Sequence, residues 1–313
     1  MNFIPFLAAA GYAHTQAWVE ALQAAMPEEN IVAIDALSGT AKAACTLAIV
    51  ANPDPNQLQQ LPALEWVHSV WAGVERLVTD VAHTDLQVVR LVDPQLARTM
   101  AEAVLTWALY LHRDIPAYAR QQAAKKWQAL PYVKAQQRTV SLLGLGALGE
   151  AAAQSLLQAG FTVCAWSHSV KSMPGVACFS GKEALPEMLA KTDILVCLLP
   201  LTPQTRGLID QQFLAHLPKG AAIINFARGA IVNDTDLLRA LDQGQLSHAV
   251  LDVFTLEPLT EAAWQWRHPQ VTVLPHCSAP TDRSTASLIV AENIRRFRKS
   301  GELPQTVDLQ RGY

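Results

Sequence analysis

The sequence has little charge bias and no long apolar run. Its 24 Lys and Arg residues against 27 Asp and Glu leave a net charge of −3 over 313 residues. This small net charge does not attract a polyanion over a broad surface. We therefore expect no nucleic-acid partner. No apolar segment reaches the ~18 residues that a membrane span needs. A signal peptide would need a basic residue near its start, but no Lys or Arg precedes Lys42. We therefore expect a soluble, cytoplasmic protein with no membrane partner.

Cysteine is also scarce. The five cysteines are odd in number, scattered, and show no CxxC spacing, so a disulfide scaffold is excluded and free thiols are expected. The His, Cys and Asp residues show no clustered spacing typical of a metal site, so we expect no metal.

What the sequence has in quantity is apolar residues in short runs. Half of the residues are apolar, and at ~150 residues per domain the length suggests about two domains. Strand-length runs alternate with helical patterns, which indicates parallel strands joined by helical crossovers. In the second part of the chain we expect six strands, at 139–143, 161–165, 193–199, 221–226, 249–253 and 271–274. In the first part we expect five, at 3–7, 31–34, 47–52, 66–70 and 88–92.

Two long helices, expected over 97–119 and 284–300, mark the crossings between the two lobes. The predicted fold is α/β, with a doubly wound Rossmann cofactor domain over 96–283. A smaller, flavodoxin-like α/β substrate domain is expected from both chain ends, 1–95 and 284–313. Two further helices, expected over 147–159 and 234–242, end near glycines.

A glycine-rich turn follows the strand expected over 139–143. Its sequence is Gly144-Leu145-Gly146-Ala147-Leu148-Gly149, and it opens a helix. In this context the first glycine allows the tight turn, the second lets the backbone approach a pyrophosphate, and the third lets the helix pack closely. We therefore expect a set of residues that binds the phosphates of a dinucleotide: Gly144, Gly146, Ala147, Leu148 and Gly149.

The end of the next strand bears on the choice of cofactor. The sequence there is Ser167-His168-Ser169-Val170-Lys171, without Asp or Glu. A carboxylate would hold the ribose hydroxyls of NAD and repel a 2′-phosphate. Hydroxyl, imidazole and ammonium donors instead suit the phosphorylated cofactor. Ser167, His168, Ser169 and Lys171 therefore predict a preference for NADPH with NADH possible, although a polar surface turn that does not contact the cofactor is the alternative interpretation.

Three charged or titratable residues stand just past buried strands: Arg228, Glu257 and His276. In an open parallel sheet the carboxyl ends of strands line the ligand crevice, so these residues can converge. Reduction of a 2-keto acid needs a cation to hold it, an acid to protonate the new alkoxide, and an anion to orient that acid. The alternatives are that Arg228 caps a helix or pairs with Asp234, and that Glu257 is only a turn residue.

With these motifs the chain resembles the D-isomer-specific 2-hydroxyacid dehydrogenases, and within them the glyoxylate/hydroxypyruvate reductases. The resemblance implies NADPH-dependent reduction of a small 2-keto acid, glyoxylate or hydroxypyruvate, with His276 as proton donor, Glu257 as its partner and Arg228 as the substrate clamp. Its motifs extend over nearly the whole chain: Ala72-Gly73-Val74, the Gly144 turn, Trp166-Ser167, Leu198-Leu199-Pro200, Ala227-Arg228-Gly229, Leu251-Asp252-Val253-Phe254, Glu257-Pro258-Leu259 and Pro275-His276.

The resemblance also assigns binding residues outside this triad. Backbone N–H groups at Ala72 and Gly73 are implied to hold the substrate carboxylate beside Trp71, and Asp252 the nicotinamide carboxamide. The other cofactor contacts that it implies are Leu199, Pro200, Thr205 and Ala227. The chain departs from these reductases at His168 and Val170, where they tend to carry arginines, so the expected preference for NADPH is smaller than a pair of arginines would give.

Other functions and the state of assembly stay open. A dinucleotide-sensing regulatory protein and a dehydrogenase with a different keto-acid substrate are the alternatives, although residues 302–313 do not resemble a recruitment tail. The helix expected over 97–119 is apolar all round, so we expect it to bury against a second subunit. The resemblance likewise implies a homodimer. The apolar residues of this helix are Met100, Val104, Leu105, Trp107, Leu109 and Leu111.

Overall fold

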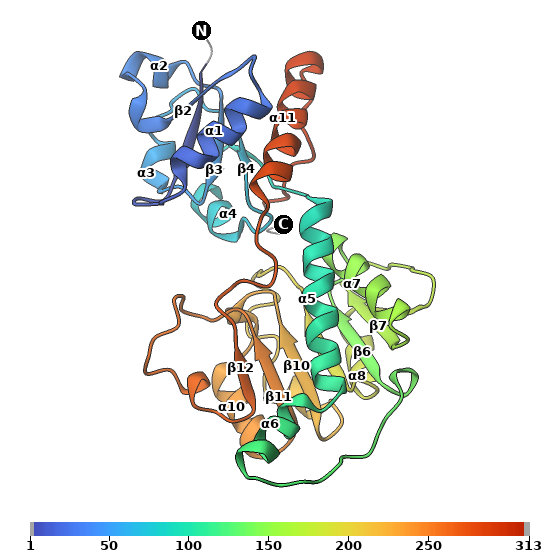
Figure 1. Ribbon diagram of the computed structural model, residues 1–313. Helices are drawn as coiled ribbons and strands as arrows, with labels where there is room; N and C mark the ends of the chain where they lie inside the picture. Colours follow the sequence, from blue (N-terminus) through green and yellow to red (C-terminus); the bar gives the residue numbers. More distant parts are fainter. Residues whose placement is uncertain (1–2, 310–313) are drawn as a thin grey trace. The chain divides into compact units, whose positions relative to one another are not determined.

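The computed structural model describes residues 3–309 (Figure 1). They divide into two compact units: unit 1 runs to Gln95 and resumes at Thr281, and unit 2 is Leu96–Pro280. Each unit has its own parallel sheet. Both sheets are covered by helices, as the alternating sequence pattern predicts.

Unit 1 has a five-stranded sheet in the order β2-β1-β3-β4-β5, which is the flavodoxin-like order. The strands are β1 (Phe3–Ala8), β2 (Asn30–Ala33), β3 (Leu47–Ala51), β4 (Trp66–Ser69) and β5 (Gln87–Val89). Helices α1 (Thr15–Ala25) and α11 (Arg283–Ser300) bury Trp18, Leu22 and Ile294 in the core on one face. On the other face α4 (Glu75–Val81) buries Leu77 and Val78. The short helices are α2 (Gly39–Ala43) and α3 (Pro55–Leu58).

Unit 2 has a seven-stranded sheet in the order β12-β11-β10-β9-β6-β7-β8. Read from β8 inward, the chain order is the 3-2-1-4-5-6 of a doubly wound dinucleotide domain with one more strand at the far edge. The strands are β6 (Thr139–Leu143), β7 (Thr162–Ser167), β8 (Val176–Ser180), β9 (Ile194–Cys197), β10 (Ala221–Asn225), β11 (Leu246–Leu251) and β12 (Val271–Val273).

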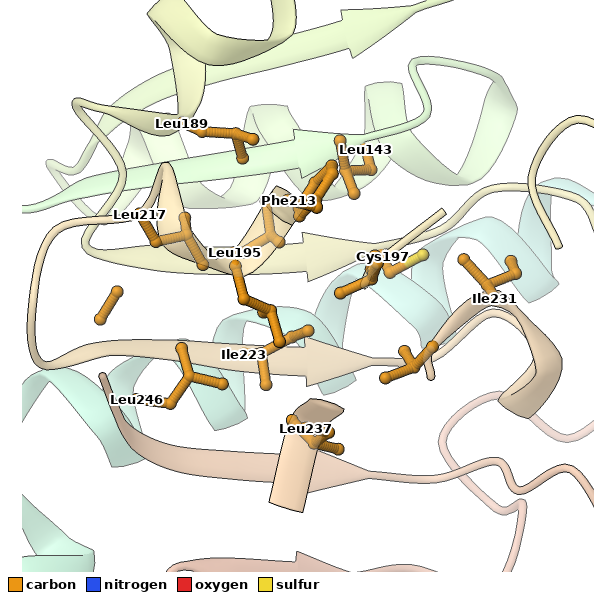
Figure 2. Packing of buried hydrophobic residues seen from close by; sticks show 14 of the residues in the cluster. Leu143, Leu189, Leu195, Cys197, Phe213, Leu217, Ile223, Ile231, Leu237 and Leu246 are labelled. Carbon is orange, nitrogen blue, oxygen red and sulfur yellow. The ribbon is translucent and has the colours of Figure 1, made fainter. Parts of the chain in front are cut away.

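Helices cover both faces of this sheet. On one face α5 (Pro94–His112) and α7 (Ala147–Gln158) bury Val104, Ala108, Ala152 and Leu156. On the other face are α8 (Leu185–Leu189), α9 (Gln211–Ala215) and α10 (Asp234–Asp242). Figure 2 shows the second core, where Leu195, Cys197 and Ile223 from the strands meet helix residues such as Phe213 and Leu237. Apolar cores therefore cover both faces of the sheet.

Two predicted elements differ from the structure. The helix expected over 97–119 is two helices, α5 and α6 (Ile115–Ala123), because Asp114 takes the left-handed conformation (φ 55°) and Pro116 starts the second helix. The prediction of six strands in unit 2 is also wrong, because β8 adds a seventh beside β7. β8 has a strand neighbour on one side only, and its residues are mostly half-buried, so its apolar signal is weak.

The burial of α5 also differs from the expectation. Met100, Val104 and Leu111 lie in the core of unit 2, and Leu105 and Trp107 pack partly against it. Only Leu109 of the six apolar residues is exposed, at 38%. The unit's own core therefore accounts for most of this helix's apolar surface. Over residues 3–309, no helix is long and apolar enough to cross a membrane.

Candidate active site

The glycine-rich turn joins β6 to α7 at the carboxyl edge of the unit 2 sheet. Gly144 has φ 106°, which favours glycine, and its N–H donates to the carbonyl of Trp166 (2.8 Å). A Cβ on Gly149 would lie 2.0 Å from the carbonyl oxygen of Gly144, so the helix can pack here only with glycine. A Cβ on Gly146 would meet nothing within 4 Å, so the backbone is open on that side.

This open turn fits a pyrophosphate. Gly146 is the N-cap of α7, and in the described chain no hydrogen bond uses the backbone N–H of Ala147 or Leu148. Such N–H groups at the start of a helix bind anions, helped by the helix dipole. The second glycine thus leaves room for a phosphate to approach, and the helix offers donors to it.

The segment after β7 has fewer free donors than the sequence suggests. The Ser167 hydroxyl donates to the carbonyl of Ser169 (2.7 Å), and the Lys171 ammonium lies 3.1 Å from the Glu150 carboxylate of α7. His168 and Ser169 are exposed. Lys171 and Glu150 are both on the surface, so their ion pair is weak and a phosphate can compete for the lysine.

Arg228 lies just past β10 in a loop fixed by the buried Asn225. The Asn225 side chain accepts from the N–H of Ala227 (3.2 Å) and donates to the carbonyl of Arg228 (3.2 Å). Arg228 is half-buried and donates to the carbonyl of Ala227 (2.6 Å). A Cβ on Gly229 would lie 2.0 Å from the carbonyl carbon of Phe254, so glycine lets this loop touch the loop after β11.

His276 and Glu257 form a direct pair. The Nδ1 of His276 lies 2.8 Å from the Oε2 of Glu257, while Oε1 of the same carboxylate accepts from the N–H of Phe254 (2.8 Å). His276 has φ 52°, a strained conformation for a residue with a Cβ, and its side chain is 53% exposed. With Nδ1 held by Glu257, Nε2 is the nitrogen left for a ligand, since it forms no hydrogen bond within residues 3–309.

Asp252 anchors the loop that carries His276. It is 2% exposed, and its two oxygens accept from the backbone N–H groups of Cys277 (2.8 Å) and Ser278 (3.0 Å). Desolvation and the Asp252 carboxylate raise the pKa of the Cys277 thiol, so the thiolate that a Cys-His dyad needs is disfavoured.

The other residues expected near a cofactor lie at the carboxyl ends of β9 and β10. Leu199 and Ala227 are buried and Pro200 is half-buried. The Thr205 hydroxyl donates to the carbonyl of Pro200 (2.7 Å) and accepts from the N–H of Thr202 (2.8 Å), so it shapes this turn.

In unit 1 the loop after β4 carries Trp71, Ala72 and Gly73. The Trp71 ring packs edge-on against Trp18 (centroids 5.8 Å apart) and Tyr12 (6.3 Å), so it is largely a core residue. No hydrogen bond among the described residues uses the N–H of Ala72 or Gly73. Two adjacent free N–H groups are suited to a carboxylate.

A buried histidine supports this loop. The side chain of His68 is fully buried, with Nδ1 2.9 Å from the carbonyl of Ser69 and Nε2 2.9 Å from the Asn293 amide of α11. The Asn293 amide donates to Nε2, because its oxygen accepts from Arg296 (3.4 Å), so Nδ1 carries the proton and donates to Ser69. The Ser69 hydroxyl accepts from the N–H of Trp71 (3.0 Å).

Several of these supporting residues are not predicted from the sequence. Asn225 precedes Ala227-Arg228 at a strand end, so its position beside a candidate cation is a usable signal. His68 and Asn293 are 225 positions apart, and no local pattern connects them. Among the described residues no group of three or more His, Cys, Asp or Glu could hold a metal ion.

The geometry defines a class of protein. A glycine turn between the first strand and first helix of a doubly wound sheet, with a His-Glu pair after β11 and β12 of the same sheet, is typical of dinucleotide-dependent oxidoreductases. The family model of the NAD binding domain of D-isomer specific 2-hydroxyacid dehydrogenases matches residues 105–278. The chain belongs to this family.

Solved structures of similar proteins agree with that assignment over the full chain. A D-isomer specific 2-hydroxyacid dehydrogenase from Xanthobacter autotrophicus, in complex with NADPH and MES, is 38% identical, covers 100% of both chains and has a TM-score of 0.92. An NADPH-dependent glyoxylate/hydroxypyruvate reductase from Sinorhizobium meliloti, with NADP and sulfate, is 32% identical over 99% of this chain and 100% of its own, with a TM-score of 0.90.

Proposed function

We propose that the protein reduces small 2-keto acids to 2-hydroxy acids with NADPH as the preferred cofactor. The observation that carries this proposal is the His276–Glu257 pair, which leaves the Nε2 of His276 for a ligand. The open glycine turn belongs to the same unit. Membership in the dehydrogenase family supports the reaction class.

Each residue of the candidate site has a role in this reaction. A bound reduced nicotinamide supplies the hydride. Arg228 holds the keto acid and polarises its carbonyl group, and the Nε2–H of His276 donates a proton to the oxygen that becomes the hydroxyl. Glu257 accepts the hydrogen bond from Nδ1, which fixes the ring and stabilises positive charge on it.

We assign cofactor binding to unit 2. The N–H groups of Ala147, Leu148 and Gly149 would hold the pyrophosphate, and Leu199, Pro200, Thr205 and Ala227 would surround the rest of the cofactor. Asp252 already accepts two backbone N–H groups, so it would use remaining lone pairs for the carboxamide. In unit 1 the N–H groups of Ala72 and Gly73 would bind the substrate carboxylate.

The preference for NADPH follows from what surrounds the 2′ position. No carboxylate follows Ser167 directly, and Lys171 can exchange the surface carboxylate of Glu150 for a phosphate. The relatives from X. autotrophicus and S. meliloti were solved with NADPH and NADP. Glyoxylate and hydroxypyruvate are the substrates that the S. meliloti relative suggests.

We also propose a homodimer joined through unit 2. Large apolar side chains remain exposed on α6 and the segment after it, with Ile115 at 44%, Trp127 at 103% and Tyr132 at 72%. Contact with a second subunit would remove this apolar surface from water. Light scattering should give twice the 34.1 kDa mass of one chain, and a mass of one chain at micromolar concentration would contradict the dimer.

The test of the reaction is a panel of keto acids assayed with both cofactors. The purified protein should oxidise NADPH when glyoxylate or hydroxypyruvate is added, and NADH more weakly. Tight NADPH binding without turnover of any 2-keto acid would favour a dinucleotide-sensing protein instead.

A further inference from the structure

Arg90 stands at the carboxyl edge of the unit 1 sheet, directly after β5. β5 pairs in parallel with β4, with Val89 opposite His68. The N–H of Leu91 donates to the carbonyl of Trp71 (3.1 Å). Arg90 therefore lies beside the start of the loop that carries Ala72 and Gly73.

The strand places Arg90 on a defined face of this sheet. Val89 and Leu91 belong to the core beneath α1 and α11, whereas Val88 belongs to the core beneath α4. Because successive residues of an extended chain point to opposite faces, Arg90 lies on the α4 face with Val88. Glu75, the first residue of α4, is near enough for its charge to act on Arg90.

The guanidinium of Arg90 has no bonded partner in the part of the chain that is described. It is half-buried, and burial lowers its pKa while the charge of Glu75 opposes that change. No hydrogen bond or ion pair joins it to residues 3–309. Three other arginines of unit 1 are paired with carboxylates: Arg76 with Asp80, Arg295 with Glu28 and Arg298 with Glu29.

A half-buried guanidinium without a protein partner keeps its donors available to an anion that enters beside it. Glu75 does not do so, since it forms no ion pair with Arg90. In the proposed function the keto-acid carboxylate is already assigned to the N–H groups of Ala72 and Gly73. Arg90 is therefore left for another negative group that enters beside this loop.

We propose that Arg90 is a specificity-determining residue that binds a second carboxylate of the substrate. This inference rests on the proposed function and deepens it, because it extends the substrate class to 2-keto dicarboxylates. The planar fork of the guanidinium suits a carboxylate in bidentate contact.

Two four-carbon substrates test this inference. Oxaloacetate and 2-ketobutyrate differ in that a carboxylate replaces a methyl group, so the ratio of their kcat/KM values isolates the second charge. We expect the wild-type ratio to favour oxaloacetate. Arg90→Gln should reduce that ratio on the order of 10- to 100-fold, the range for a hydrogen bond to a charged group, while turnover of glyoxylate changes little. Arg90→Lys should give an intermediate ratio, because an ammonium keeps the charge and loses the fork.

Arg76→Gln is the matched control, since Arg76 is exposed on α4 and already paired with Asp80; its ratio should equal that of the wild type. A wild-type enzyme that does not favour oxaloacetate, or an unchanged ratio in Arg90→Gln, would overturn the inference. A binding test separates this from the proposed function. Malonate should raise the Tm of the wild-type protein more than propionate does, and Arg90→Gln should remove that difference even if no keto acid is turned over.

Discussion

Acidification should destabilise the protein through two buried histidines, His68 in unit 1 and His248 in unit 2. They are 0% and 5% exposed, and burial lowers the pKa of each from 6.5 to about 4. Because the folded pKa is the lower one, the unfolded chain binds protons more readily, so this stability is complete above pH 6.5 and is lost as the pH falls toward 4. At 1.36 kcal/mol per pH unit, the full contribution is about 3 kcal/mol per histidine, of which about 2 kcal/mol is lost by pH 5.

Urea unfolding of wild type and His68→Gln at pH 7 and pH 5 measures this loss, with separate fits if the two units unfold in separate transitions. Between these pH values the variant should lose about 2 kcal/mol less free energy of unfolding than the wild type does. His83→Gln, at an exposed position in the same unit, should follow the wild-type curve. Equal pH dependence in wild type and His68→Gln would refute the argument.

Three further predictions concern the candidate site. Lys171→Ala should raise KM for NADPH and leave KM for NADH nearly unchanged, and parity of the two cofactors in the wild type would show that this segment does not contact the phosphate. Glu257→Gln should lower kcat by about 10- to 100-fold. The carboxylate offers separate oxygens to Phe254 N–H and His276 Nδ1–H, whereas the amide has one oxygen and no negative charge to stabilise a protonated imidazole. A normal kcat would remove Glu257 from the mechanism. Gly149→Ala should destabilise unit 2 and lower its Tm, because the new Cβ would lie 2.0 Å from the Gly144 oxygen. Gly146→Ala should fold normally, because its Cβ meets no protein atom within 4 Å, but it should bind NADPH weakly. Equal Tm values for both glycine variants would contradict this distinction.

The sequence predicts the fold where the pattern is local and repeated. Buried parallel strands form continuous apolar runs, so β6, β9, β10 and β11 are evident without a structure. The edge strand β8 has no such signal in the sequence, since its residues are mostly half-buried and need no continuous apolar run. The break between α5 and α6 at Asp114 has a signal in the sequence, because Ile115-Pro116 follows it. The apolar pattern of α5 continues up to this point, so it favours one long helix.

For the candidate site, the glycine turn and the position of His276 at a strand end could be predicted because each motif implies its own geometry. The contacts that tune the site could not be predicted. Lys171 and Glu150 are 21 positions apart on different elements, and no sequence rule brings a surface lysine to one carboxylate rather than another. The same holds for the unpaired state of Arg90, which depends on everything packed around it.

The central claim is that His276 donates the proton in a nicotinamide-dependent reduction of a 2-keto acid. The most direct test is steady-state oxidation of NADPH with glyoxylate by wild type and His276→Gln, together with the Kd for NADPH of both proteins. We expect kcat to fall on the order of 10²- to 10⁴-fold in the variant, the contribution of a positioned general acid, while the Kd for NADPH is unchanged. A variant that retains wild-type kcat would contradict the claim.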